Sequence, residues 1–168
     1  PIRYLGMPLT LGRIRLVHLQ YLLDRIKSRL AGWKVRLMPI SGRRVLVRSM
    51  LSVLLAFVIA VMRAPKKFHK EVDKARRRFL WAQDEEISGG KCKVKWKLVT
   101  SPVDCGGLGI PDMERFARAL RLRWLWLAWK HPDRPWVGTG SPCDDKDREL
   151  FAAETRVAIG NGRKATFW

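Results

Sequence analysis

The spacing of apolar side chains predicts helices over most of the chain. Between residues 16 and 33 apolar positions recur every three or four residues, and Arg25, Lys27 and Arg29 lie on other faces, which is the pattern of an amphipathic helix. A second helix is predicted from Ser41, whose hydroxyl can cap the first turn, towards Pro65. Because residues 49–62 of this helix carry no charge, we expect it to be buried on most sides.

A third amphipathic pattern occupies residues 65–81, PKKFHKEVDKARRRFLW. Pro65 is acceptable in a first helical turn, where an N–H has no partner inside the helix. Four apolar residues align on one face: Phe68, Val72, Ala75 and Phe79. Basic residues fill the other faces: Lys66, Lys67, Lys70, Lys74, Arg76, Arg77 and Arg78.

A fourth helix is predicted from Met113, with Asp112 as its N-cap, in the segment MERFARALRLRWLWLAWKHP. Its wide apolar stripe includes three tryptophans, which we expect in the core or at a protein interface rather than against nucleic-acid bases: Trp124, Trp126 and Trp129. Three arginines are expected on its solvent side: Arg115, Arg118 and Arg121.

The remaining segments predict short strands, turns and a C-terminal helix. PIRYLGMPLTLG predicts a strand leading into a loop, and the alternation in KCKVKW predicts an exposed edge strand. GGLG lacks the Lys-Ser/Thr of a phosphate loop and is interpreted as a turn. Beyond Pro132 a polar linker is expected before a short helix around Glu149 to Ala158, and GNGRKATFW predicts a turn and a strand. The fold class is therefore mainly α: a helical bundle with a few short strands and a C-terminal helical extension.

The charge of the chain indicates what kind of partner it binds. The formal net charge is +19, and residues 1–84 hold +15 of it. A hydrophobic content of 47% excludes a disordered basic tail, so the chain is expected to fold and to bind a polyanion. Six side chains are the candidates for nucleic-acid contacts: Arg43, Arg44, Arg48, Lys66, Lys67 and Lys70. For any single lysine, a role in solubility alone remains open.

Membrane and secretory locations are not expected. The uncharged run of residues 49–62 is shorter than the roughly 20 residues of a membrane-spanning helix, and it lies far from the N-terminus, where a signal sequence would be. The three cysteines are too scattered for a disulfide framework and form no CxxC pair. A reducing compartment, nuclear or cytoplasmic, is therefore predicted.

Catalytic patterns are not found in the sequence. His18, His69 and His131 show no metal-ligand spacing, and we expect solvated or capping roles for them. Asp144 and Asp145 are adjacent, as are the metal-holding aspartates of polymerases, but they lie in a polar loop without flanking hydrophobic strands. We therefore predict no catalytic residue, no metal site and no cofactor in this chain.

The order of motifs carries a family resemblance. RYLGMPL, LAGWK, ISGRRVLVRSML, FLW, KVKW, GGLGIPD and IGNGRKATFW follow one another along the chain. This series resembles the region downstream of the catalytic palm in non-LTR (LINE-type) retrotransposon reverse transcriptases, particularly those of plants. The resemblance covers essentially the whole chain.

The resemblance implies a division into four segments. Residues 1–12 would be a palm-edge strand and loop, 13–83 a thumb-like helical bundle, 84–131 a connection with a short strand and the Trp-rich helix, and 132–168 a linker and C-terminal extension. The family's aromatic-Ala-Asp-Asp metal motif precedes the YLG segment and does not occur in this sequence. Polymerase activity and its divalent metal would therefore belong to a full-length parent, of which this chain would be a truncated or degenerate piece.

Three functions follow as hypotheses. In the first, the chain is a non-catalytic fragment that binds template-primer RNA, DNA or RNA/DNA hybrid through backbone phosphates and contacts the palm and fingers of the remaining polymerase. In the second, it is a protein-interaction scaffold that docks through its Trp-rich helix. The third, an enzyme of unrecognised type, is disfavoured because no constellation of His, Cys and carboxylate residues supports it.

Overall fold

The computed structural model describes residues 3–4, 7–8, 10, 12–32, 37–81, 92, 94–156 and 158. The described residues are mainly helical, which confirms the predicted fold class. The chain divides into two compact units, Pro1–Leu120 and Arg121–Trp168, and each is described by itself. The four-segment division implied by the family resemblance stays a prediction.

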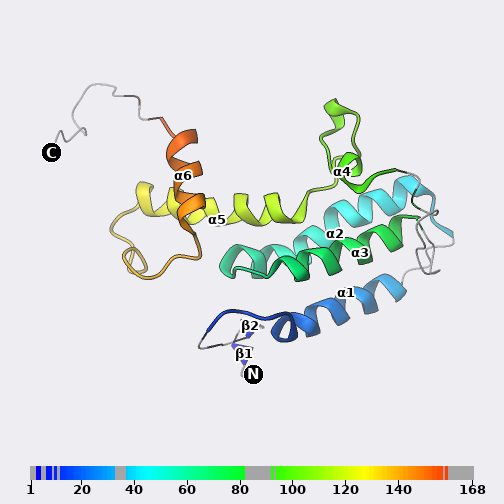
Figure 1. Cartoon of the computed structure of the whole chain (residues 1–168), viewed down its shortest axis with the longest axis horizontal. Coiled ribbons are helices and arrows are strands. Elements are labelled where there is room, and N and C mark those ends of the chain that lie inside the picture. Colours follow the sequence, from blue (N-terminus) through cyan, green and yellow to red (C-terminus); the bar gives the residue numbers. More distant parts are fainter. Residues whose placement is uncertain are drawn as a thin grey trace. The chain divides into compact units, whose positions relative to one another are not determined.

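The first unit is built on three long helices, α1, α2 and α3. α3 lies between α1 and α2 and contacts both (Figure 1). A two-residue antiparallel ladder of β1 and β2 precedes them, where a strand and loop were predicted. The elements are β1 (Arg3–Tyr4), β2 (Met7–Pro8), η1 (Leu16–Leu19), α1 (Gln20–Gly32), α2 (Ile40–Val61), α3 (Lys66–Trp81), α4 (Trp96–Val99), η4 (Val103–Cys105) and the start of α5 (Met113–Lys130).

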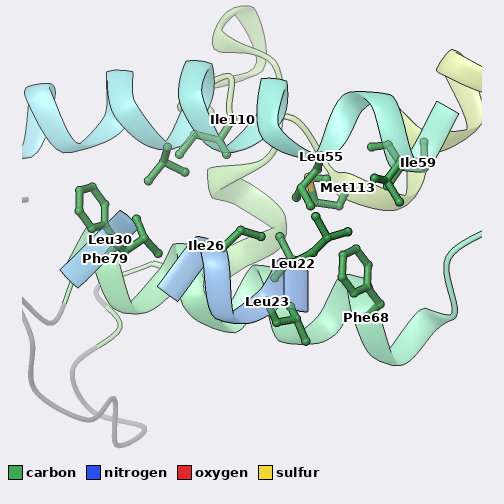
Figure 2. Close-up of a cluster of buried hydrophobic side chains, with 14 of the residues drawn as sticks. Leu22, Leu23, Ile26, Leu30, Leu55, Ile59, Phe68, Phe79, Ile110 and Met113 are labelled. Atoms are coloured by element: carbon green, nitrogen blue, oxygen red, sulfur yellow. The ribbon is translucent and has the colours of Figure 1, made fainter. Parts of the chain in front are cut away.

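The core of this unit lies where the three helices meet. Figure 2 shows apolar side chains that gather there: Leu22, Leu23, Ile26 and Leu30 of α1, Leu55 and Ile59 of α2, Phe68 and Phe79 of α3, with Ile110 and Met113. Leu55, Ile59 and Phe68 are fully buried, and each such side chain contributes about 2 kcal/mol of transfer free energy. The predicted apolar face of α3 is confirmed, since Val72 and Phe79 are also buried and Ala75 packs against the cluster.

The start of α2 corrects the predicted cap. The helix begins at Ile40 after its N-cap residue Pro39, whose side chain forms no capping hydrogen bond. Ser41 already lies within the first turn, so its hydroxyl is not at the N-cap position. The helix ends at Val61, four residues before Pro65.

The prediction that α2 is buried on most sides is also wrong. Val45, Val53 and Phe57 recur along one face of the helix and are 60%, 73% and 54% exposed. The described neighbours of α2 pack on its other face, so the absence of charge in residues 49–62 does not bring burial all round. Within the described ranges, none of the helices combines the length and apolarity that crossing a membrane requires.

The predicted edge strand KCKVKW is wrong in its described part. Val94 lies in a bend, Lys95 is the N-cap of α4, and Trp96 is its first residue. Lys91 and Lys93 lie outside the described residues. Trp96 packs against the core, and that anchoring outweighs the alternating pattern of the segment.

The turn predicted for GGLG is confirmed. Gly106 and Gly109 have φ angles of 75° and 63°, in the left-handed region that glycine adopts without a steric penalty. The N–H of Gly107 donates to the Pro102 carbonyl at 2.9 Å, and the N–H of Gly109 donates to the Ser101 carbonyl at 3.1 Å. This backbone network fixes the loop that carries Ile110 into the core.

Gly107→Ala is expected to destabilise the first unit by about 2 kcal/mol. A Cβ at position 107 would lie 2.1 Å from the Ser101 carbonyl oxygen and 2.8 Å from that of Leu98, so the backbone of the loop would have to shift. Urea unfolding measures the change. Gly12→Ala is the matched control, because nothing lies within 4 Å of its Cβ position, and equal unfolding midpoints for the two variants would contradict the prediction.

The second unit contains the C-terminal part of α5 and α6 (Asp145–Glu154). The residues between these helices form hydrogen-bonded turns, including Val137 N–H to the Arg134 carbonyl at 2.9 Å. Trp136 lies edge-on to Trp124, with ring centroids 5.2 Å apart. Trp136 and Val137 are half-buried within the otherwise exposed residues 132–140, and the assignment of a linker after Pro132 stays a prediction. The segment GNGRKATFW lies outside the described residues.

A buried ion pair joins the two helices of this unit. Arg121 Nε donates to Asp147 Oδ2 at 2.9 Å, and Asp147 is fully buried. Asp144 caps α6 by accepting the Asp147 N–H at 2.8 Å. The expectation that Arg121 lies on the solvent side of its helix is therefore wrong, because a carboxylate 26 residues later draws it inward.

Candidate nucleic-acid interface

One face of α3 is basic along its whole length. Lys66, Lys70 and Lys74 follow one another at intervals of four residues, which places them in one row. Arg77 lies within the same range of angles around the helix, and Lys67 and Arg78 extend it on one side, so that the six cations occupy about a third of the helix circumference. All are exposed except Arg77, which is half-buried. These six residues are called the α3 basic face below.

The α3 basic face is held in place by the opposite side of the same helix. Phe68, Val72 and Phe79 are buried in the core and fix the rotation of α3. The face runs from Lys66 to Arg78, about 18 Å at the rise of an α-helix. One strand of a nucleic-acid duplex presents about five phosphates over that length. A rigid row of this length can therefore meet several phosphates at once.

The two carboxylates of α3 affect the basic face little. Glu71 is half-buried at its border. Asp73 is paired with Arg76, whose Nη1 donates to Asp73 Oδ1 at 2.9 Å. The charge of Asp73 is thus paired with the buried Arg76 and not with a cation of the α3 basic face.

Arg76 holds the C-terminal part of α3 against the rest of the unit. It is fully buried, and its Nη2 donates to the Pro111 carbonyl at 2.8 Å, while its guanidinium lies 5.6 Å from the centre of the Trp96 ring. Burial lowers the pKa of Arg76 and raises that of Asp73, and in each the opposite charge of the partner offsets the shift. The expectation that Arg76 shares the polar faces of α3 is wrong.

The three candidate arginines of α2 lie beside α3 and the glycine loop. Arg43 is 7% exposed, and its Nη1 donates to the Leu80 carbonyl at 3.1 Å. Arg44 Nε donates to the Leu108 carbonyl at 2.7 Å. Arg48 is exposed. Arg43 and Arg44 thus have structural hydrogen bonds, and the role of all three in binding stays a prediction.

The candidate lysines occupy a different position. Lys66, Lys67 and Lys70 are exposed and form the first half of the α3 basic face. Lys74, Arg77 and Arg78 belong to the same basic segment of α3 but are not among the six candidates. The four-residue spacing from Lys66 to Lys74 was the signal that would have included the first of them.

The tryptophans of α5 do not share one environment. Trp124 packs against Trp136, whereas Trp126 and Trp129 are 46% and 48% exposed. All three were expected in the core or at a protein interface, and the exposure of Trp126 and Trp129 leaves the interface for these two. Their role at an interface stays a prediction.

The described residues hold no group of three or more His, Cys, Asp or Glu side chains placed to bind a metal ion. His18 is a capping residue, as predicted, since its Nδ1 accepts the Arg15 N–H at 3.2 Å. The three cysteines are free, and burial raises the pKa of the Cys143 thiol. The predicted compartment, nuclear or cytoplasmic, stays a prediction.

Comparison with curated proteins shows a similarity to a plant protein. The "Putative ribonuclease H protein" of Arabidopsis thaliana is 28% identical to this chain over 131 residues. The chain is similar to part of a plant protein. The match covers 78% of this chain and 21% of the plant protein, so the chain spans about a fifth of that relative's length. No protein-family model and no solved structure matches it.

Proposed function

We propose that this chain is a non-catalytic segment of a LINE-type reverse transcriptase and binds the template-primer duplex through its phosphates. The observation that carries the proposal is the α3 basic face: six cations within about a third of the circumference of a helix whose opposite side is buried. Contacts to phosphates position a protein on a duplex without reading its sequence. A thumb that follows a moving template-primer needs contacts of this kind.

Two further observations support the proposal. The motif order resembles the region downstream of the palm in that family, where a thumb-like bundle follows the YLG segment. The similarity to a fifth of a plant protein named for ribonuclease H is consistent with a piece of a larger nucleic-acid enzyme. In that setting the palm and fingers are the protein partners, and the divalent metal belongs to the palm.

Salt dependence tests the proposal. If each cation of the α3 basic face neutralises one phosphate, the logarithm of the binding constant for an RNA/DNA hybrid is expected to fall with the logarithm of salt concentration at a slope of about −4 to −5. Fluorescence anisotropy from low to physiological salt measures it. A slope near zero would show that phosphate contacts do not drive binding.

The second hypothesis, a protein scaffold, has one observation in its favour. Trp126 and Trp129 are large aromatic side chains of which nearly half remains exposed, and exposed aromatic surface is typical of interaction sites. The exposure indicates an interaction surface on α5. The charge of the side chains around this surface indicates which class of partner can bind there.

A further inference from the structure

The second unit carries an exposed aromatic cluster that the α3 basic face does not involve. The Trp126 and Trp129 rings lie 5.4 Å apart at 76°, and Trp129 lies edge-on to Phe151 at 6.3 Å. In an edge-to-face pair, the ring that contributes its edge keeps both of its faces clear of that partner. Trp126 and Trp129 are also 46% and 48% exposed, so part of each ring is accessible to a further planar group.

Cations flank these rings. Arg123 lies three residues before Trp126, and Lys130 lies four residues after it, so all three occupy one face of α5. Both cations are exposed, and residues 121–130 contain no Asp or Glu. On α6, Arg148 and Glu154 lie one turn before and one turn after Phe151, so opposite charges balance there. The charge beside Trp126 is thus positive.

We propose that Trp126 and Trp129 form a stacking platform for the unpaired bases of a single-stranded nucleic acid, with Arg123 and Lys130 on the adjacent phosphates. Every base has a π-face, and proteins that bind single strands without sequence preference combine stacking aromatics with cations along the backbone. Two exposed cations and no carboxylate in residues 121–130 complement the phosphates of a nucleic-acid strand, which favours such a strand as the occupant of this face. This site lies on a different unit from the α3 basic face and does not rest on the function proposed above.

Two labelled strands of about twelve nucleotides test the platform in the full chain: one of thymidines and one of abasic residues with the same phosphates. The wild-type chain is expected to bind the thymidine strand more tightly. Trp126→Ala is expected to weaken binding of the thymidine strand by about 5- to 100-fold per stacked base and to leave the abasic strand unaffected. Trp126→Phe, which keeps an aromatic ring, is expected to retain part of the affinity.

Phe57→Ala is the matched control. Phe57 is 54% exposed on α2, and the residues three and four positions away on either side are uncharged: Val53, Leu54, Ala60 and Val61. Its replacement removes an exposed aromatic ring without a neighbouring cation, so binding of the thymidine strand is expected to stay at the wild-type value.

The comparison of the two strands on the wild-type chain needs no variant and decides the proposal even if Trp126→Ala fails to fold. Equal affinity for both strands would overturn the platform and leave a protein partner as the use of these tryptophans. A loss in Trp126→Ala that is the same for both strands, with wild-type helicity by circular dichroism, would also overturn it. Charge variants on α3 are expected to leave the preference for the thymidine strand in place, because the platform lies on the other unit.

Discussion

Replacement of Lys66, Lys67 and Lys70 by alanine is expected to weaken binding to an RNA/DNA hybrid by about 100-fold or more near 0.1 M salt. Binding through fewer phosphate contacts releases fewer counterions. The slope of the logarithm of the binding constant against the logarithm of salt concentration is therefore expected to become shallower by about 2 to 3. The three side chains are exposed, and none contributes to the core, so the fold should be unaffected. Anisotropy titrations at several salt concentrations measure both effects.

The control for this variant removes the same charge from another helix. Three exposed cations of α1 serve for this control: Arg25, Lys27 and Arg29. Their replacement by alanine removes the same number of positive charges. A much smaller loss of affinity is expected for this control. Equal losses for the two triple variants would show that net charge, rather than the α3 basic face, determines binding.

Arg76→Ala is expected to lower the free energy of unfolding by about 3 to 5 kcal/mol. The substitution removes the partner of Asp73 and the donor to the Pro111 carbonyl, and it leaves both acceptors in a buried region. It also leaves a void beside Trp96. Urea unfolding followed by circular dichroism measures the loss, and a change below about 1 kcal/mol would show that the pair contributes little to the fold.

The pH dependence of Arg76→Ala gives a second readout. Burial already raises the pKa of Asp73, and the charge of Arg76 opposes that rise. Without Arg76 the folded-state pKa is expected to rise further above the unfolded value of about 4. The folded state then binds more protons than the unfolded state, so stability falls as pH rises through the folded-state pKa. The double variant Asp73→Asn/Arg76→Met lacks this carboxylate and is expected to lose that pH dependence.

The helices of this protein could be predicted from the sequence because their apolar residues are periodic. The core face of α3 follows from the spacing of Phe68, Val72 and Phe79, and the cap of α5 follows from Asp112, whose Oδ1 accepts the N–H groups of Glu114 and Arg115 at 3.0 Å. These signals are local, since each depends on residues within a few turns. The exposed lysines of α3 follow from the same periodicity.

The buried arginines could not be predicted because their partners are distant in the sequence. Arg43 reaches the Leu80 carbonyl 37 residues later, and Arg76 reaches the Pro111 carbonyl 35 residues later. A basic residue beside an apolar run has the same local pattern whether it meets solvent or a buried carbonyl. Only tertiary packing separates the structural cations from those on the α3 basic face.

The exposure of Trp126 and Trp129 was also beyond sequence reasoning. Apolar side chains surround most of the helix in residues 121–130, and this pattern predicts core or interface positions without deciding between them. The described residues of the second unit supply α6 and the turns before it, and they cover Trp124 but only about half of each of the other two tryptophans. The sequence of a helix does not specify how much of its apolar surface the rest of a short unit covers.

Lysine footprinting tests the central claim most directly. The chain is acetylated with and without an RNA/DNA hybrid, and each lysine is quantified by mass spectrometry. If the α3 basic face binds the duplex, Lys66, Lys67, Lys70 and Lys74 are protected together, while Lys27 of α1 reacts as in the free chain. Protection of Lys27 equal to that of the α3 lysines, or no protection of α3, would contradict the account.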